Sequence, residues 1–149
     1  MNLNQEQDCE FKWQIGDVGC IAFLRSCTRI HTKGKFMLRE LDLSGNGIGD
    51  KTASCLQEIL DTNDVVRNTL ISLNLNNNRI TGKAAHELCI SFSVHDVRKY
   101  ICMKRNRLVN EDREILRSKE KAEELNMHII VDPPVYLPSK PKKRAEFKL

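Results

Sequence analysis

A pattern of aliphatic residues around an asparagine occurs three times along this chain. In each copy, aliphatic residues alternate before the asparagine, and another stands two positions after it. The copies span residues 38–48, 70–80 and 101–108. A unit that recurs at a period of about 30 residues predicts an array of stacked repeats rather than one closed core. The asparagines of the three copies are Asn46, Asn78 and Asn106.

Each repeat carries the signals of a strand, a turn and a helix. Leu41 and Leu43 alternate with polar residues, which is the period of a strand. Gly45 and Gly47 flank the first asparagine and indicate a tight turn. Apolar residues four positions apart then predict a helix. The helical pairs are Leu56 with Leu60 and Leu88 with Phe92. Stacked repeats would also bury equivalent residues in rows. One row is Ile48, Ile80 and Leu108, and another is Leu56, Leu88 and Leu116.

A partial repeat precedes the first full copy. Residues 15–17 have the same sequence as residues 48–50, which puts Trp13 at the position of the asparagine. The matching strand positions hold Asp8 and Glu10, so we predict that the first strand is lost and only its helix remains. In this register, the packing residues expected on that helix are Cys20, Phe23 and Cys27.

The same period predicts a last strand at residues 128–131. The helix before it is expected from Glu111 to Leu125 and is rich in charge. Arg113 stands where the earlier repeats carry Ala53 and Ala85, so we expect this helix to be a solvated cap.

The net charge of the chain indicates a separate tail. The whole chain carries +4, and residues 138–149 account for all of it. We predict an N-terminal segment at 1–12, a repeat solenoid at 13–132 and a flexible basic tail at 133–149. A short basic run in the tail resembles a nuclear-import signal, the alternative being a basic tail for solubility or for an acidic partner. This run contains Lys140, Lys142, Lys143 and Arg144.

The composition argues against secretion and against membrane insertion. Aromatic residues are 5% of the chain, and its first eight residues are mostly polar. No apolar run approaches the roughly 18 residues that span a bilayer. The six cysteines include no CxxC pair and suit a reducing compartment. We therefore expect a cytoplasmic location, with a cytoskeletal or ciliary one as a possibility, and the basic tail leaves a nuclear one open.

Two motifs suggest chemistry, but the repeat explains them better. The segment that contains His86 and Cys89 begins like the zinc-binding helix of a zinc protease. Ile90, however, stands where that helix needs its second histidine. His95 is the only nearby third ligand. The glycines at 45, 47 and 49 lack the Lys-Ser/Thr pair of a phosphate loop. We expect no metal, no cofactor, no small-molecule substrate and no catalytic residue.

Over roughly residues 11–132, the pattern resembles the leucine-rich repeat family, in particular its ribonuclease-inhibitor-like class. The resemblance implies an α/β fold, a short right-handed solenoid with parallel strands on its concave face and helices on its convex face. It also implies that the repeated asparagines satisfy backbone groups of the turns.

The family implies binding to proteins rather than catalysis. Strand residues between the buried leucines are expected on the concave face, in rows that begin acidic, continue with amides and become basic near Lys99, Lys104 and Arg105. The alternative is a plain solvated face, with contacts on the convex side or the edges. The predicted protein-binding residues are Glu40, Asp42, Ser44, Ser72, Asn74, Asn76, Tyr100, Cys102 and Lys104, in rows that end at His128, Ile130 and Asp132.

We therefore expect a non-catalytic interaction module, a structural or adaptor subunit like those that similar proteins provide in ciliary and other large complexes. The alternative is a regulator or inhibitor of one target, similar to ribonuclease inhibitors or repeat-containing GTPase regulators. We expect one or more protein partners in a stable complex, no membrane, and nucleic acid only through the tail. The open edge of the strand at 38–43 supports a partner, because unpaired edges invite pairing.

Overall fold

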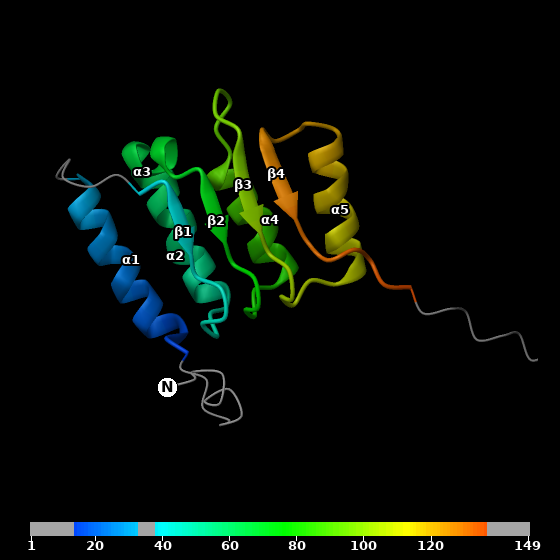
Figure 1. Cartoon of the computed structure of the whole chain (residues 1–149), viewed down its shortest axis with the longest axis horizontal. Coiled ribbons are helices and arrows are strands. Elements are labelled where there is room, and N and C mark those ends of the chain that lie inside the picture. The colour runs from blue at the N-terminus through cyan, green and yellow to red at the C-terminus, as the bar shows by residue number, and fades with distance from the viewer. Residues whose placement is uncertain (1–13, 33–37, 137–149) are drawn as a thin grey trace, which may run out of the picture.

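Each full repeat folds as a short strand, a turn and a helix, in the predicted order (Figure 1). The computed structural model describes residues 14–32 and 38–136. The strands lie side by side in one layer, and α2 and α4 lie behind them. The strands are β1 (Glu40–Asp42), β2 (Ser72–Asn74), β3 (Lys99–Cys102) and β4 (Met127–Ile130). The helices are α1 (Gly16–Thr32), α2 (Asp50–Thr62), α3 (Asp64–Thr69), α4 (Gly82–Phe92) and α5 (Asn110–Lys121).

The strands form an open parallel sheet in the order β1-β2-β3-β4. Leu41 pairs with Leu73, Leu73 with Ile101, and Ile101 with Ile129, so equivalent residues of successive repeats are neighbours. Parallel neighbours need a crossover connection, which the helices provide. The expected short α/β solenoid is therefore confirmed. We call the face of the sheet turned away from α2 and α4 the concave face.

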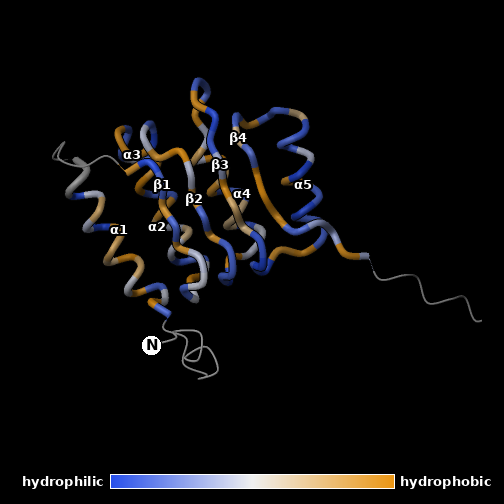
Figure 2. Tube along the Cα trace, in the orientation of Figure 1, coloured by the Kyte–Doolittle hydropathy of each residue, from blue (hydrophilic) through white to orange (hydrophobic). Residues whose placement is uncertain are grey.

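The predicted aliphatic rows are buried between the sheet and the helices. Leu56, Leu88 and Leu116 are at most 3% exposed, and burial of each such side chain contributes about 2 kcal/mol. In α5, Leu116 is the only buried residue, and Figure 2 shows this helix as mainly hydrophilic, as expected for a cap. Within the ranges that the structure describes, no helix is long and apolar enough to cross a membrane.

The helix of the partial repeat is present as α1, but its packing differs from the prediction. Cys20 is buried and Cys27 is half-buried, whereas Phe23 is 46% exposed. Leu24 is buried in its place, because it lies one helical turn after Cys20 and shares its face. Trp13 and the predicted lost strand lie outside the described residues.

Two helices also differ from the prediction. The first repeat contains an additional helix, α3, which begins where the side chain of Asn63 accepts a hydrogen bond from the N–H of Val66 (3.1 Å). Helix α5 ends at Lys121 rather than at Leu125. Glu123 has a φ of 54°, a conformation that does not continue a right-handed helix.

We call Asn46, Asn78 and Asn106 the asparagine ladder, in which Asn78 and Asn106 each tie their turn to the turn before it. The Oδ1 atom of Asn78 accepts hydrogen bonds from the N–H groups of Asn46 (3.0 Å) and Ile48 (3.2 Å). Its Nδ2 atom donates to the carbonyls of Leu43 (2.9 Å) and Leu75 (3.1 Å). Asn106 repeats the pattern one unit later, accepting from Ile80 and donating to Leu75.

Carboxylates form a second set of links, between the starts of the helices. Asp17 accepts hydrogen bonds from the N–H of Gly49 (2.9 Å) and the hydroxyl of Thr52 (2.6 Å). Asp50 accepts from the N–H and the hydroxyl of Thr81. Burial acts to raise the pKa of Asp17, but these hydrogen bonds outweigh it and the pKa is lowered. The carboxylate of α1 thus fastens this helix to α2 without needing a strand of its own.

Substitution of the central asparagine tests the importance of the ladder. We expect Asn78→Ala to lower the free energy of unfolding by about 3 kcal/mol, because several backbone groups lose their partner in a buried turn. Urea denaturation measures this change.

Asn46→Ala is the matched control. The side chain of Asn46 donates one hydrogen bond, to the carbonyl of Ser44, so its loss should cost about 1 kcal/mol. Equal losses in the two variants would contradict a special role of the central asparagine.

Candidate protein-binding surface

The first predicted row lies across the concave face in register. Glu40 pairs with Ser72, Ser72 with Tyr100, and Tyr100 with His128. Tyr100 is 44% exposed, and its ring meets the ring of His128 edge-on at a centroid distance of 6.0 Å. Tyrosine presents a large apolar surface with a polar tip, a combination that is common at protein interfaces.

The second row is also in register, but its polar members take part in local hydrogen bonds. Asp42 accepts hydrogen bonds from the hydroxyl (2.6 Å) and the N–H (2.9 Å) of Ser44, and these bonds hold the pKa of Asp42 below its usual value. Asn74 accepts from the N–H of Asn76 (3.0 Å). Burial raises the pKa of the Cys102 thiol, so little of the reactive thiolate is present.

The third row connects the loops that follow the strands. Asn76 accepts a hydrogen bond from the N–H of Lys104 (2.8 Å), and Asp132 accepts one from the N–H of Arg105 (2.6 Å). Each of these side chains therefore positions the loop of a neighbouring repeat. The first row does not hold the loops. Within the described residues, Glu40 and Ser72 make no side-chain hydrogen bond and remain available to a partner.

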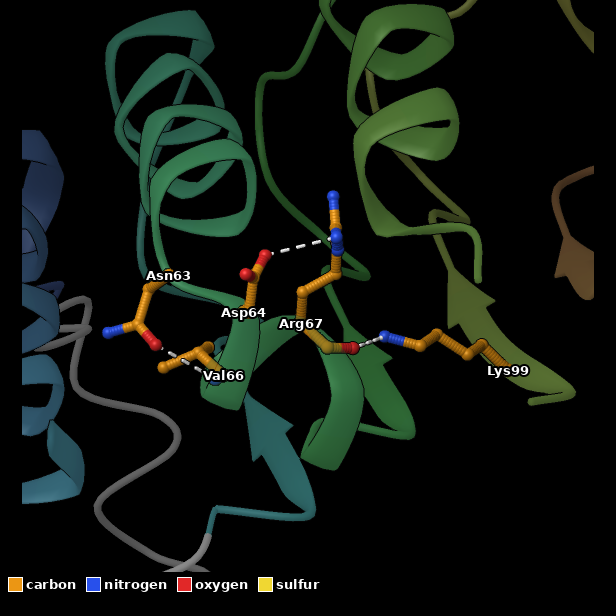
Figure 3. Close-up of polar contacts among 5 residues, drawn as sticks. All are labelled: Asn63, Asp64, Val66, Arg67 and Lys99. Carbon is orange, nitrogen blue, oxygen red and sulfur yellow. Dashed lines mark hydrogen bonds and ion pairs between the residues drawn. The ribbon is translucent and has the colours of Figure 1, made fainter. Parts of the chain in front are cut away.

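Lys99 does not belong to this surface, contrary to the prediction. Its side chain is fully buried, where its ammonium donates to the carbonyl of Arg67 at the end of α3 (Figure 3) and lies 4.3 Å from the ring centroid of Phe92. Strand alternation explains the error, because Lys99, Ile101 and Met103 face the same side. No carboxylate pairs with Lys99 among the residues that the structure describes. Burial, with a smaller effect from the charge of Arg67, lowers the pKa of Lys99 to about 8.

The candidate zinc residues do not form a site. Cys89 is fully buried in the core, and burial raises its pKa to about 12. His86 lies 3.5 Å from a carboxylate oxygen of Asp112, and His95 is on an exposed loop. Nowhere in residues 14–32 or 38–136 do three His, Cys, Asp or Glu side chains gather to hold a metal.

The structure contains a groove at the end of the array that the sequence did not predict. It lies beside β4 and α5 and has a volume of about 790 Å³. One oxygen of Glu120 accepts a hydrogen bond from the N–H of Ile129 (3.0 Å), and the other lies 2.8 Å from Nδ1 of His128. The contact of Glu120 with β4 occurs in one repeat only, so the sequence carries no repeated pattern that would predict it.

The predicted import signal lies outside the described residues.

Comparison with known proteins identifies the repeat. Residues 34–56 and 67–89 match a family model described as Leucine Rich repeat. The two matches lie in the first two full repeats and contain their strands and part of α2 and α4. The ribonuclease-inhibitor-like class is not distinguished by these matches. No curated protein matches the chain significantly.

Replacement of the buried lysine should stabilise the protein. Lys99→Met keeps a long side chain but removes a charge that burial disfavours, so we expect the free energy of unfolding at pH 7 to rise by about 1 kcal/mol. The pKa of Lys99 is about 8 in the folded protein, below its ordinary value of 10.5, so the unfolded chain binds more protons between these values. Stability of the wild type should therefore rise with pH across this window, and the advantage of the variant should shrink.

Urea denaturation at pH 7 and pH 10 measures both effects. Lys104→Met, on an exposed lysine of the same repeat, is the control and should change stability little. A destabilised Lys99→Met variant would show that the contacts with Arg67 and Phe92 outweigh the cost of burial.

Proposed function

We propose, from the leucine-rich repeats that this chain carries, that it is a non-catalytic protein-interaction module and a structural or adaptor subunit of a larger assembly. Leucine-rich repeats generally mediate contacts between proteins, through the extended surfaces that stacked units create. The observation that carries the proposal is the first row of the concave face. Its side chains align across the repeats and, apart from His128, which contacts Glu120 of α5, make no side-chain hydrogen bond within the described residues.

The chemistry of this row suggests what it would contact. Glu40 supplies negative charge at β1, and Asp42 adds to it on the same strand. Tyr100 provides an exposed aromatic surface on β3, next to the ring of His128. A partner segment with basic groups near β1 and an apolar side chain near β3 would match this order. We infer that Tyr100 contributes most of the binding energy, because aromatic residues dominate such contacts.

The same face offers little for catalysis. Cys102 lies in the second row of this face, and burial raises the pKa of its side chain, which keeps it as a thiol. The carboxylate of Asp42 is occupied by Ser44. We therefore infer that the chain is not an enzyme. The cysteines at 20, 27, 55, 89 and 102 are all free, which supports a reducing compartment such as the cytoplasm.

A charge placed in the middle of the row tests the proposal. We expect Ser72→Arg to weaken partner binding about tenfold or more, because a long cation would stand between Glu40 and Tyr100. The measurement is recovery of the native complex on the tagged full chain, quantified by mass spectrometry. An activity assay on the recovered partner then separates a subunit from a regulator.

Ser54→Arg is the matched control, because Ser54 is exposed on α2, away from the concave face. It should leave recovery unchanged, and both variants should melt close to the wild type. If the two variants lose the partner equally, or if Ser72→Arg recovers as much complex as the wild type, the binding site does not lie on the first row.

A further inference from the structure

The outer edge of β4 has backbone groups positioned for another strand. Leu43, Leu75 and Met103 each donate their N–H to a carbonyl of the next strand, at 2.8, 2.7 and 2.8 Å. Val131 occupies the same position in the fourth repeat. No fifth strand follows it in the part of the chain that the structure describes. The N–H of Val131 is therefore directed to where the carbonyl of a fifth strand would lie.

One neighbouring position on this edge is covered by a side chain. Ile129 points its N–H outward as Val131 does, and Glu120 of α5 accepts it at 3.0 Å. The carboxylate takes the place of a carbonyl from a further strand. It is also 2.8 Å from Nδ1 of His128, which helps to keep it there. This cover is a single hydrogen bond acceptor on an exposed helix, so another acceptor can replace it.

The groove beside this edge has room and charge for a polypeptide segment. Its volume is about 790 Å³, and Figure 1 shows β4 as the outermost strand beside α5. Three basic side chains line it, and Glu114 and Glu120 are the acidic ones. Three basic side chains against two acidic ones give the groove a net charge of +1. The basic residues are Lys104, Arg117 and Lys121.

We propose that this edge binds an extended acidic segment of a partner protein, which adds to the sheet as a fifth strand. Its backbone accepts the N–H of Val131 and displaces Glu120 from Ile129, while its carboxylates approach Arg117 and Lys121. The tail of this chain is basic, so its charge disfavours it as the occupant. The site is distinct from the concave face and does not depend on the function proposed there.

Fluorescence polarisation with the full chain tests the proposal. The probe is a labelled eight-residue peptide of alternating aspartate and valine, and the comparison peptide has lysine in place of aspartate. We expect saturable binding of the acidic peptide that weakens with salt, and binding of the lysine peptide at least about tenfold weaker. No saturable binding, equal binding of both peptides, or full competition by an oligonucleotide would overturn the proposal.

Backbone methylation tests whether the peptide binds as a strand. Two acidic peptides carry N-methyl groups on alternate amides, one set on the odd residues and the other on the even residues. Successive amides of a strand point to opposite edges. One methylated peptide should therefore bind like the parent and the other should bind at least about tenfold more weakly. Equal affinities of the two would exclude strand addition.

Variants of the protein locate the site. The pair Arg117→Glu and Lys121→Glu should weaken the acidic peptide about tenfold or more, whereas the control pair Lys51→Glu and Lys83→Glu, on exposed residues of α2 and α4, should not. Glu120→Ala should tighten binding, because it uncovers the N–H of Ile129.

Glu120→Gln separates the two contributions of Glu120, since it removes the charge but keeps an acceptor. Glu120→Ala should therefore bind more tightly than Glu120→Gln. Equal affinities for these two variants would reduce the role of Glu120 to its charge and contradict displacement. If either charge-reversal pair fails to fold, the methylated peptides still decide the question.

Discussion

The asparagine ladder is the interaction on which the rest of the structure depends. The strands are only three or four residues long, so the sheet alone supplies few hydrogen bonds between repeats. Asn78 belongs to one repeat but binds backbone groups of the repeat before it, at Leu43, Asn46 and Ile48. A buried turn cannot leave such groups unpaired. The side chain thus fixes the spacing of the repeats, which places the leucines in rows and the polar residues in register.

Features that recur could be predicted from the sequence, because each repeat confirms the next. The strands, their parallel order and the buried rows follow from the repeated spacing. The predicted burial of Phe23 was wrong, because the partial repeat has no second copy that would show which face of its helix points to the core. The burial of Lys99 was missed although strand alternation indicates it, since a charged residue was assumed to face water. The contact of Glu120 with β4 depends on where α5 ends and could not be predicted.

The concave face shows why a row of polar residues is not by itself a binding site. In the sequence, all three rows look equally suited to contact a partner. In the structure, Asp42, Asn74 and Asn76 hold the loops, and their hydrogen bonds restrict the side chains to one arrangement. That restriction keeps the surface rigid under the first row. A rigid support lowers the entropy lost when a partner orders Tyr100, so the loop-holding residues would contribute to binding without touching the partner.

Different hydrogen bonds stabilise the incomplete repeat at each end of the array. At the beginning, α1 lacks a described strand but is fastened to α2 by the carboxylate of Asp17. At the other end, β4 is followed by no further strand among the described residues and receives the carboxylate of Glu120. Asp17 binds three donors at the start of a helix, two N–H groups and a hydroxyl, and is hard to replace. Glu120 binds one N–H on the outer edge of the sheet, where the backbone carbonyl of an added strand can also act as the acceptor. The end closed by fewer hydrogen bonds is therefore the one at which the sheet can be extended.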